Sequence, residues 1–182
     1  ECPVCFKMTE KITFEVRKKH ILYLCKLCDV VFSRPFVAGD SLWYKESGIY
    51  ELARFHNKPY WHHEQFLKEP PPGSTILDIG CNNGVFLHHA EKLGYEVTGM
   101  DFNNNSLEAG RQAFGLKRLF CCTLEDFAQK FPDEKFDVIT VFEVLEHLDH
   151  PNDFLEAVKS LLKPSGYIAI SVPNRDMMIN PL

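Results

Sequence analysis

Four cysteines near the start of the chain are spaced as ligands of a metal ion. Cys2 and Cys5 form one C-x-x-C pair, and Cys25 and Cys28 form another after nineteen intervening residues. Four thiolates in this spacing suit tetrahedral zinc, and the closed ligand shell leaves no position for water, so the expected role is structural. Reduced cysteines without a metal are the alternative, which the doubled spacing disfavours.

The segment around these cysteines has β-forming residues at 12–16 and 21–24 but too few apolar side chains for a core of its own. Metal binding would supply the missing stability. Phe6 and Asp29 stand where such knuckles usually carry glycine, which predicts less regular turns.

A second group of residues forms a glycine-bracketed turn. Residues 76–79 resemble a strand, Gly80 and Gly84 bracket the turn, and a helical pattern follows. Glycine lets the backbone approach a ligand closely, and a helix N-terminus offers unpaired N–H groups. Asp101 closes the next strand 21 positions after Gly80, the spacing of an acid that binds ribose hydroxyls. This spacing predicts an adenosine-containing cofactor without choosing among such cofactors.

Glu143, Glu146 and His147 follow a third strand-like segment, where ligands gather in doubly wound sheets. If this stretch is helical, the three side chains share one face. Such a cluster could hold a divalent metal or supply a general base. We favour His147 as a base over a metal ligand and name His147 and Glu143 as candidate catalytic residues.

The elements that must position these residues alternate between β-rich and helical runs, which predicts βαβ units on a parallel sheet. The expected strands are 75–79, 96–100, 118–122, 136–142 and 167–172. The expected helices are 84–93, 106–114, 124–130 and 152–162. The predicted fold class is α/β, a doubly wound, mostly parallel Rossmann-like sheet with a small N-terminal zinc ribbon.

Residues 77–84, Leu-Asp-Ile-Gly-Cys-Asn-Asn-Gly, resemble the first motif of class I S-adenosylmethionine (SAM)-dependent methyltransferases. Residues 99–101 resemble the acidic end of that family's second strand, 136–139 its fourth strand, and 162–167 the turn before its fifth. Asn82 replaces the family's middle glycine, and certain sugar-modifying methyltransferases have this G-x-N-x-G version. A Rossmann-like domain that binds a nicotinamide cofactor, or none, is the alternative.

The resemblance implies that SAM is the cofactor. By it, Asp78 and Gly80 border the methionine part of SAM, Asp101 binds the ribose, and Phe102 lies against adenine. The other cofactor contacts that it implies are Cys81, Asn82 and Gly84 in the loop, Leu124 and Glu125 beside adenine, and Phe142 and Glu143 across the cofactor.

The acceptor is expected to be a small molecule. Residues 25–32 resemble the second knuckle of bacterial methyltransferases associated with sugar and cell-surface polysaccharide modification. Residues 143–147 resemble metal-binding E-x-x-E-H motifs of some quinone-biosynthesis and RNA-end methyltransferases, so these acceptors stay open. A catalytically silent zinc-ribbon and SAM-fold binding module is the alternative of another class.

Three parts are expected: a zinc-ribbon module at 1–37, an aromatic helical linker or lid at 38–73, and a SAM-binding methyltransferase domain at 74–182. The Glu-Pro-Pro-Pro-Gly run at 69–73 marks a boundary because it stops any helix. The ten residues after Val172 are too few for the last two strands of that family, so we expect the domain to be C-terminally incomplete.

The formal net charge of -5 gives no overall basic surface for a phosphate backbone, so nucleic acid is a disfavoured partner. The sequence also has no apolar run long enough for a membrane span and no signal-peptide pattern, so we expect a cytoplasmic protein without a membrane partner. The oligomeric state is not predicted.

Overall fold

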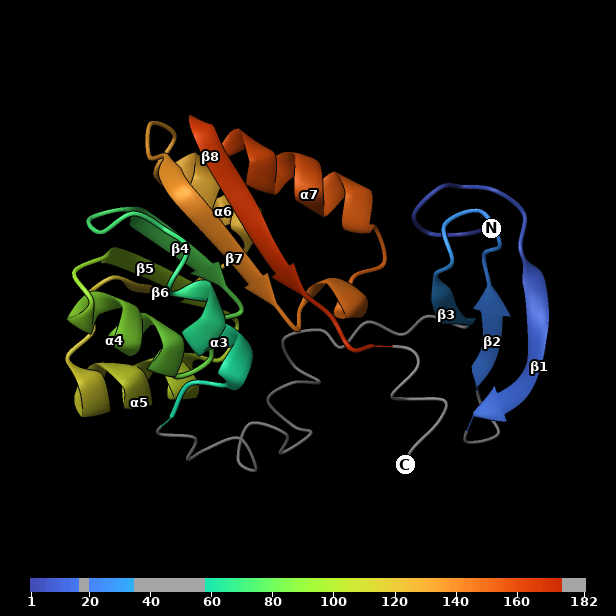
Figure 1. Ribbon diagram of the computed structural model, residues 1–182, viewed down its shortest axis with the longest axis horizontal. Coiled ribbons are helices and arrows are strands. Elements are labelled where there is room, and N and C mark those ends of the chain that lie inside the picture. Colours follow the sequence, from blue (N-terminus) through green and yellow to red (C-terminus); the bar gives the residue numbers. More distant parts are fainter. Residues whose placement is uncertain (17–19, 35–57, 175–182) are drawn as a thin grey trace.

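The computed structural model describes residues 1–16, 20–34 and 58–174, which form two separate sheets (Figure 1). The N-terminal sheet is antiparallel, with the order β1-β2-β3. Its strands are β1 (Glu10–Val16), β2 (His20–Leu24) and β3 (Val31–Arg34). Most of the expected aromatic linker, residues 38–57, lies outside the described residues.

The larger sheet has the order β6-β5-β4-β7-β8, and all its neighbouring strands are parallel. Its strands are β4 (Thr75–Ile79), β5 (Glu96–Asp101), β6 (Leu119–Cys121), β7 (Phe136–Phe142) and β8 (Leu162–Ser171). The chain order reverses between β4 and β7, and open α/β sheets bind ligands at the carboxyl ends of the strands beside such a point. The predicted α/β fold class is therefore confirmed.

Helices cover both faces of the parallel sheet (Figure 1). They are α3 (Trp61–Phe66), α4 (Val85–Lys92), α5 (Asn104–Phe114), α6 (Leu124–Lys130) and α7 (Pro151–Ser160). Helices α3, α4 and α5 lie on one face, and α6 and α7 on the other.

Side chains of successive residues in the central strands pack into two separate hydrophobic cores, one on each face of the sheet. Ile76 of β4 packs with Leu87 of α4, whereas the next residue, Leu77, packs with Val158 of α7. All four side chains are fully buried. Because both faces are covered, β4 and β7 place apolar side chains on both sides of the sheet, as is typical of buried parallel strands.

The start of β8 differs from the prediction. Helix α7 ends at Ser160, and β8 begins at Leu162, so it includes the Pro164-Ser165-Gly166 stretch that was expected to be a turn. The pairing with β7 shifts register here, because Phe136 pairs with Leu162 but Val138 pairs with Tyr167. The extra residues form an irregularity within the strand, where long-range pairing overrides the local turn signal.

No helix among residues 1–16, 20–34 and 58–174 is long and apolar enough to cross a bilayer.

Candidate cofactor site and cysteine cluster

The loop between β4 and α4 is held against the end of β5 by backbone hydrogen bonds. The N–H groups of Gly80 and Cys81 both donate to the carbonyl of Met100, at 2.8 and 3.0 Å. Gly80 has a φ of 80°, and Gly84, which caps α4, has a φ of 73°, both in the left-handed region that favours glycine. The Cβ of any other residue at Gly80 would overlap Cγ2 of Val144. Both bracketing glycines are therefore required by the turn.

Asp101 ties this loop to the turn that begins α5. Its Oδ2 accepts from the backbone N–H of Asn82 and its Oδ1 from that of Asn103, each at 2.8 Å. Asn82 has a φ of 50°, so the residue that replaces the family's glycine keeps a left-handed backbone, which Asn tolerates better than most residues. A carboxylate has about four acceptor positions, so these two bonds are compatible with ribose hydroxyls at the same group.

Asp78 lies beneath the loop, on β4. Its carboxyl group is buried, and its Oδ1 accepts a hydrogen bond from the hydroxyl of Thr140 at 2.6 Å. Burial raises the pKa of Asp78 to about 7, the charge of Asp101 adds to that rise, and the Thr140 hydrogen bond opposes it. Near pH 7, therefore, the Asp78 carboxyl group next to the loop is protonated in a fraction of the molecules.

Cys81 faces the core instead of the ligand edge. Its side chain is 6% exposed and belongs to the core between the sheet and α4. Burial raises the pKa of its thiol well above the ordinary value. The Cys81 thiol therefore serves packing.

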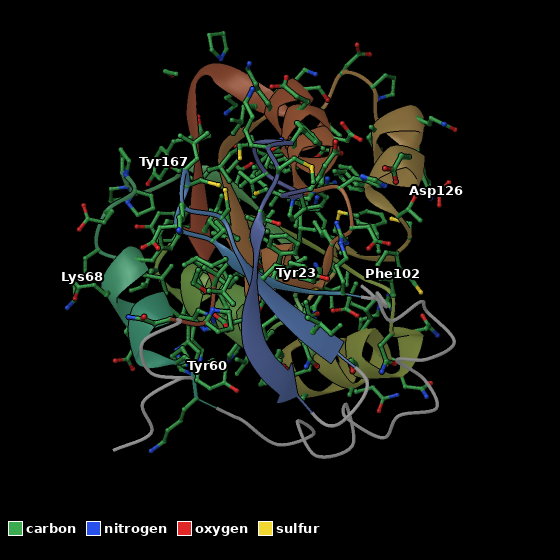
Figure 2. The ribbon with its side chains drawn as sticks, turned by 90° about the vertical axis from the view of Figure 1, so that its right-hand side faces the viewer. Tyr23, Tyr60, Lys68, Phe102, Asp126 and Tyr167 are labelled. Carbon is green, nitrogen blue, oxygen red and sulfur yellow. The ribbon has the colours of Figure 1, made fainter. Side chains whose placement is uncertain are left out.

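The implied adenine contacts lie at the ends of β5 and β6. Phe102, the residue after β5, is 45% exposed, and the Cys121 thiol donates to its carbonyl at 3.5 Å. Leu124 is buried at the start of α6 and Glu125 beside it is exposed. Figure 2 labels Phe102 and, on α6, Asp126, and shows both from the side of the three-stranded sheet. An exposed aromatic ring offers a flat apolar surface on which a base can stack.

The helical face that Glu143, Glu146 and His147 would share if 143–147 were a helix does not form. Only Leu145–His147 forms a helical turn, of the 3-10 type, and Glu143 precedes it with a φ of 56°. The N–H of Glu143 donates to the carbonyl of Ser171, which continues the β7 to β8 pairing and turns Glu143 away from a helical path. Among the residues that the structure describes, Glu143, Glu146 and His147 do not gather as the ligands of one metal ion.

Glu146 and His147 remain neighbours, with 3.9 Å between Oε1 of Glu146 and Nε2 of His147. Burial raises the pKa of Glu146, and its Oε2 is buried without a hydrogen-bond partner in the described part of the chain. The His147 side chain is 53% exposed. An exposed imidazole here can exchange a proton with a molecule at the carboxyl edge of the sheet.

The ring of Phe142 points into an aromatic cluster and does not lie on an open edge. It contacts His63 at 5.1 Å, Phe66 at 5.7 Å and Phe86 at 5.5 Å between ring centroids. This cluster joins α3, α4 and the end of β7. The sequence pattern missed both the cluster and Thr140, because their contacts join residues far apart in the chain.

The four predicted zinc ligands do come together. The Sγ atoms of Cys2, Cys5, Cys25 and Cys28 all lie within 4.8 Å of one another. Within the described residues, no other group of three or more cysteine, histidine or acidic side chains is assembled as such a set. Four converging thiols are the donor set that structural zinc prefers, so the residues fit that metal.

The two knuckles have matching backbones. The N–H of Cys2 donates to the carbonyl of Lys7 and that of Cys25 to the carbonyl of Val30, both at 2.9 Å. Phe6 and Asp29 have φ values of 57° and 54°, the left-handed conformation that glycine usually supplies. The expected irregularity of these turns is therefore wrong, because the backbones of Phe6 and Asp29 adopt the conformation that the turn needs.

The comparisons with known proteins agree with this geometry. Residues 50–180 match the model of a family described as a methyltransferase domain. The ubiquinone biosynthesis O-methyltransferase of Glaesserella parasuis serovar 5 is 39% identical over 110 residues, 57% of this chain and 47% of that protein. Its Pasteurella multocida counterpart is 36% identical over 117 residues, 58% of this chain and 48% of that protein. The chain spans about half the length of the curated relatives it matches.

Two solved structures show the same fold. The plantazolicin methyltransferase BpumL, in complex with a triazolic desmethylPZN analog and SAH, has a TM-score of 0.61 and 23% identity, covering 77% of this chain and 56% of that one. A TehB-like SAM-dependent methyltransferase from Corynebacterium glutamicum has a TM-score of 0.56 and 25% identity, covering 71% of each chain.

Proposed function

Because the chain belongs to the methyltransferase-domain family whose model its residues 50–180 match, we propose that it binds SAM and methylates a hydroxyl of a small molecule. The observation that carries the proposal is the Gly80–Gly84 loop, which is tied through Asn82 to the carboxylate of Asp101. This tie joins the two features that bind an adenosine cofactor in doubly wound folds, the glycine turn and the acid at the end of the next strand.

Each residue at the carboxyl edge of the sheet would contact a different part of the cofactor. Asp101 would accept hydrogen bonds from the ribose hydroxyls, while Phe102 and Leu124 would lie against adenine. Gly80 and Asp78 would border the methionine end, with Cys81, Asn82 and Gly84 forming the turn beside it. The exposed Glu125 would lie beside the adenine edge, and Phe142 would support this edge from the aromatic cluster.

SAM, when bound, supplies a methyl group on a positively charged sulfur, which is already activated for transfer. The protein therefore has mainly to align the acceptor with that methyl group. Glu143 would orient the acceptor by accepting a hydrogen bond from its hydroxyl, and His147 would take the proton as base.

Two classes of acceptor hydroxyl are supported as the site of methylation. The curated relatives are named for O-methyl transfer in ubiquinone biosynthesis, which makes a phenolic hydroxyl the first acceptor to test. The knuckle at 25–32 supports a sugar hydroxyl, as in polysaccharide precursors. The cytoplasmic location and the three-part domain division stay predictions.

The convergence of the four cysteine thiols is the evidence for a structural zinc ion, which would hold the N-terminal sheet together. A closed four-thiolate shell leaves the metal no position for substrate, so its contribution would be to folding.

Calorimetry with S-adenosylhomocysteine (SAH), followed by a transfer assay with methyl-labelled SAM, tests the proposal. The acceptors are a catechol carboxylic acid, a nucleotide sugar and a short single-stranded RNA. Transfer to either of the first two supports the proposal, and transfer to RNA alone contradicts it. Binding of SAH without transfer to any of them would support the silent binding module instead.

A further inference from the structure

Glu143 has a backbone conformation that glutamate seldom adopts. It is the first residue after β7, and its φ of 56° places it in the left-handed region. A side chain with a Cβ is strained there, and such residues persist only where their surroundings hold them. The question is therefore what holds Glu143.

Ser171, the last residue of β8, holds it twice. The backbone N–H of Glu143 donates to the Ser171 carbonyl at 3.0 Å. The Ser171 hydroxyl donates to Oε1 of Glu143 at 2.9 Å. One residue therefore fixes both the backbone turn and the direction of the carboxylate.

The same turn reaches the cofactor loop. Val144, the next residue, packs so closely on Gly80 that no side chain fits at Gly80. The exposed Glu143 carboxylate is thereby placed between the glycine loop and the end of β8, at the carboxyl edge of the sheet. An acceptor hydroxyl must approach this edge if SAM binds at the loop.

We propose that Ser171 is a positioning residue that holds the Glu143 carboxylate toward the acceptor hydroxyl. The inference rests on the proposed function. In the transfer step, the acceptor oxygen bonds to the methyl carbon and loses its proton to His147, while the sulfur keeps the electron pair of the broken S–C bond. Glu143 accepts the hydrogen bond that orients the hydroxyl, and Ser171 keeps that carboxylate in place.

Steady-state kinetics of Ser171→Ala, Ser171→Thr and Glu143→Gln, with the catechol carboxylic acid as acceptor, test the role. We expect Ser171→Ala to raise the acceptor KM about tenfold, because a methyl side chain has no hydroxyl to donate to the carboxylate. Ser171→Thr keeps the hydroxyl and should recover activity to within about threefold of the unmodified chain. The SAH affinity should change less than about twofold in Ser171→Ala and Ser171→Thr, because Ser171 is not placed on the cofactor.

Ser160→Ala is the matched control, because the Ser160 hydroxyl donates only to the nearby Ala157 carbonyl at the end of α7. The double variant Ser171→Ala with Glu143→Gln should be no worse than Glu143→Gln alone, as expected when one residue acts through the other. Additive losses, or equal losses in Ser171→Ala and Ser171→Thr, would overturn the positioning role while leaving methyl transfer established.

A chain that binds SAH but methylates no acceptor would overturn the proposed function instead. Hydrogen exchange then decides whether the tie itself exists, since it needs no turnover. Exchange at the Glu143 amide should be at least about tenfold faster in Ser171→Ala than in Ser171→Thr if the hydroxyl fixes the turn. Equal exchange rates would contradict the tie.

Discussion

The hydroxyl of Thr140 donates to the buried carboxyl group of Asp78 at 2.6 Å, across the pair of strands between which the sheet reverses its order. This contact places a proton-binding group directly under the glycine loop. Because burial raises the pKa of Asp78 to about 7, the group titrates in a range where proteins are ordinarily studied.

The first prediction concerns the pH dependence of stability. The folded protein holds a proton on Asp78 up to about pH 7, whereas the unfolded chain releases it near the ordinary aspartate pKa of 3.8. The folded state therefore binds more protons in this window, and the free energy of unfolding should fall as pH rises through it. Between pH 5 and pH 8 the Asp78 contribution is roughly 3 kcal/mol.

Urea unfolding of the unmodified chain and of Asp78→Asn, at pH 5 and pH 8, measures this contribution. The variant keeps an oxygen for the Thr140 hydroxyl but cannot ionise, so the loss attributed to Asp78 should be absent from it. The same pH dependence in both proteins would refute an elevated pKa at Asp78.

The second prediction concerns the cofactor. Asp101→Ala should weaken binding of both SAM and SAH by about 10- to 100-fold, the usual loss for charge-assisted hydrogen bonds. Calorimetry with SAH measures it. Glu108→Ala, which removes an exposed carboxylate of α5 paired with Arg111, is the control and should bind normally. Undiminished affinity in a folded Asp101→Ala protein would remove Asp101 from the site.

The third prediction separates backbone strain from crowding at two glycines. Gly80 and Gly115 both have left-handed φ values, of 80° and 72°, but only at Gly80 does an added Cβ meet another side chain. Gly115→Ala should cost about 1 kcal/mol of unfolding free energy. Gly80→Ala should cost about 2 kcal/mol more, because Val144 must move.

Denaturant unfolding of the two variants tests this difference, and calorimetry with SAH should show weakened binding in Gly80→Ala alone. Similar stability losses in both proteins would mean that Val144 moves aside at little cost.

The fourth prediction concerns the metal. Elemental analysis should find about one zinc ion per chain, as expected for a single four-thiolate site. Cys5→Ser should lower the zinc content and increase hydrogen exchange in β2, because metal binding replaces a hydrophobic core in this sheet. Cys121→Ser, which changes an exposed thiol outside the cluster, should keep its zinc. A metal-free protein with a protected β2 would disprove the site.

The sequence alone determined the elements whose signals are local. Strands β4 and β7 lie where expected, at 75–79 and 136–142, because each is a short apolar run that ends in a loop signal. The doubled C-x-x-C spacing predicted a thiol cluster, and these thiols do converge. Such features can be predicted from local residue types, because they depend on the period of apolar residues and on the spacing of cysteines along the chain.

Only the tertiary structure decided which side chains meet at the edge of the sheet. The pairing of Thr140 with Asp78 and of Ser171 with Glu143 joins residues 62 and 28 positions apart. Glu143 takes a left-handed turn and does not start a helix, because its backbone pairs with the end of β8. Strand order and register set these contacts, and neither is recorded in the spacing of residues along the chain.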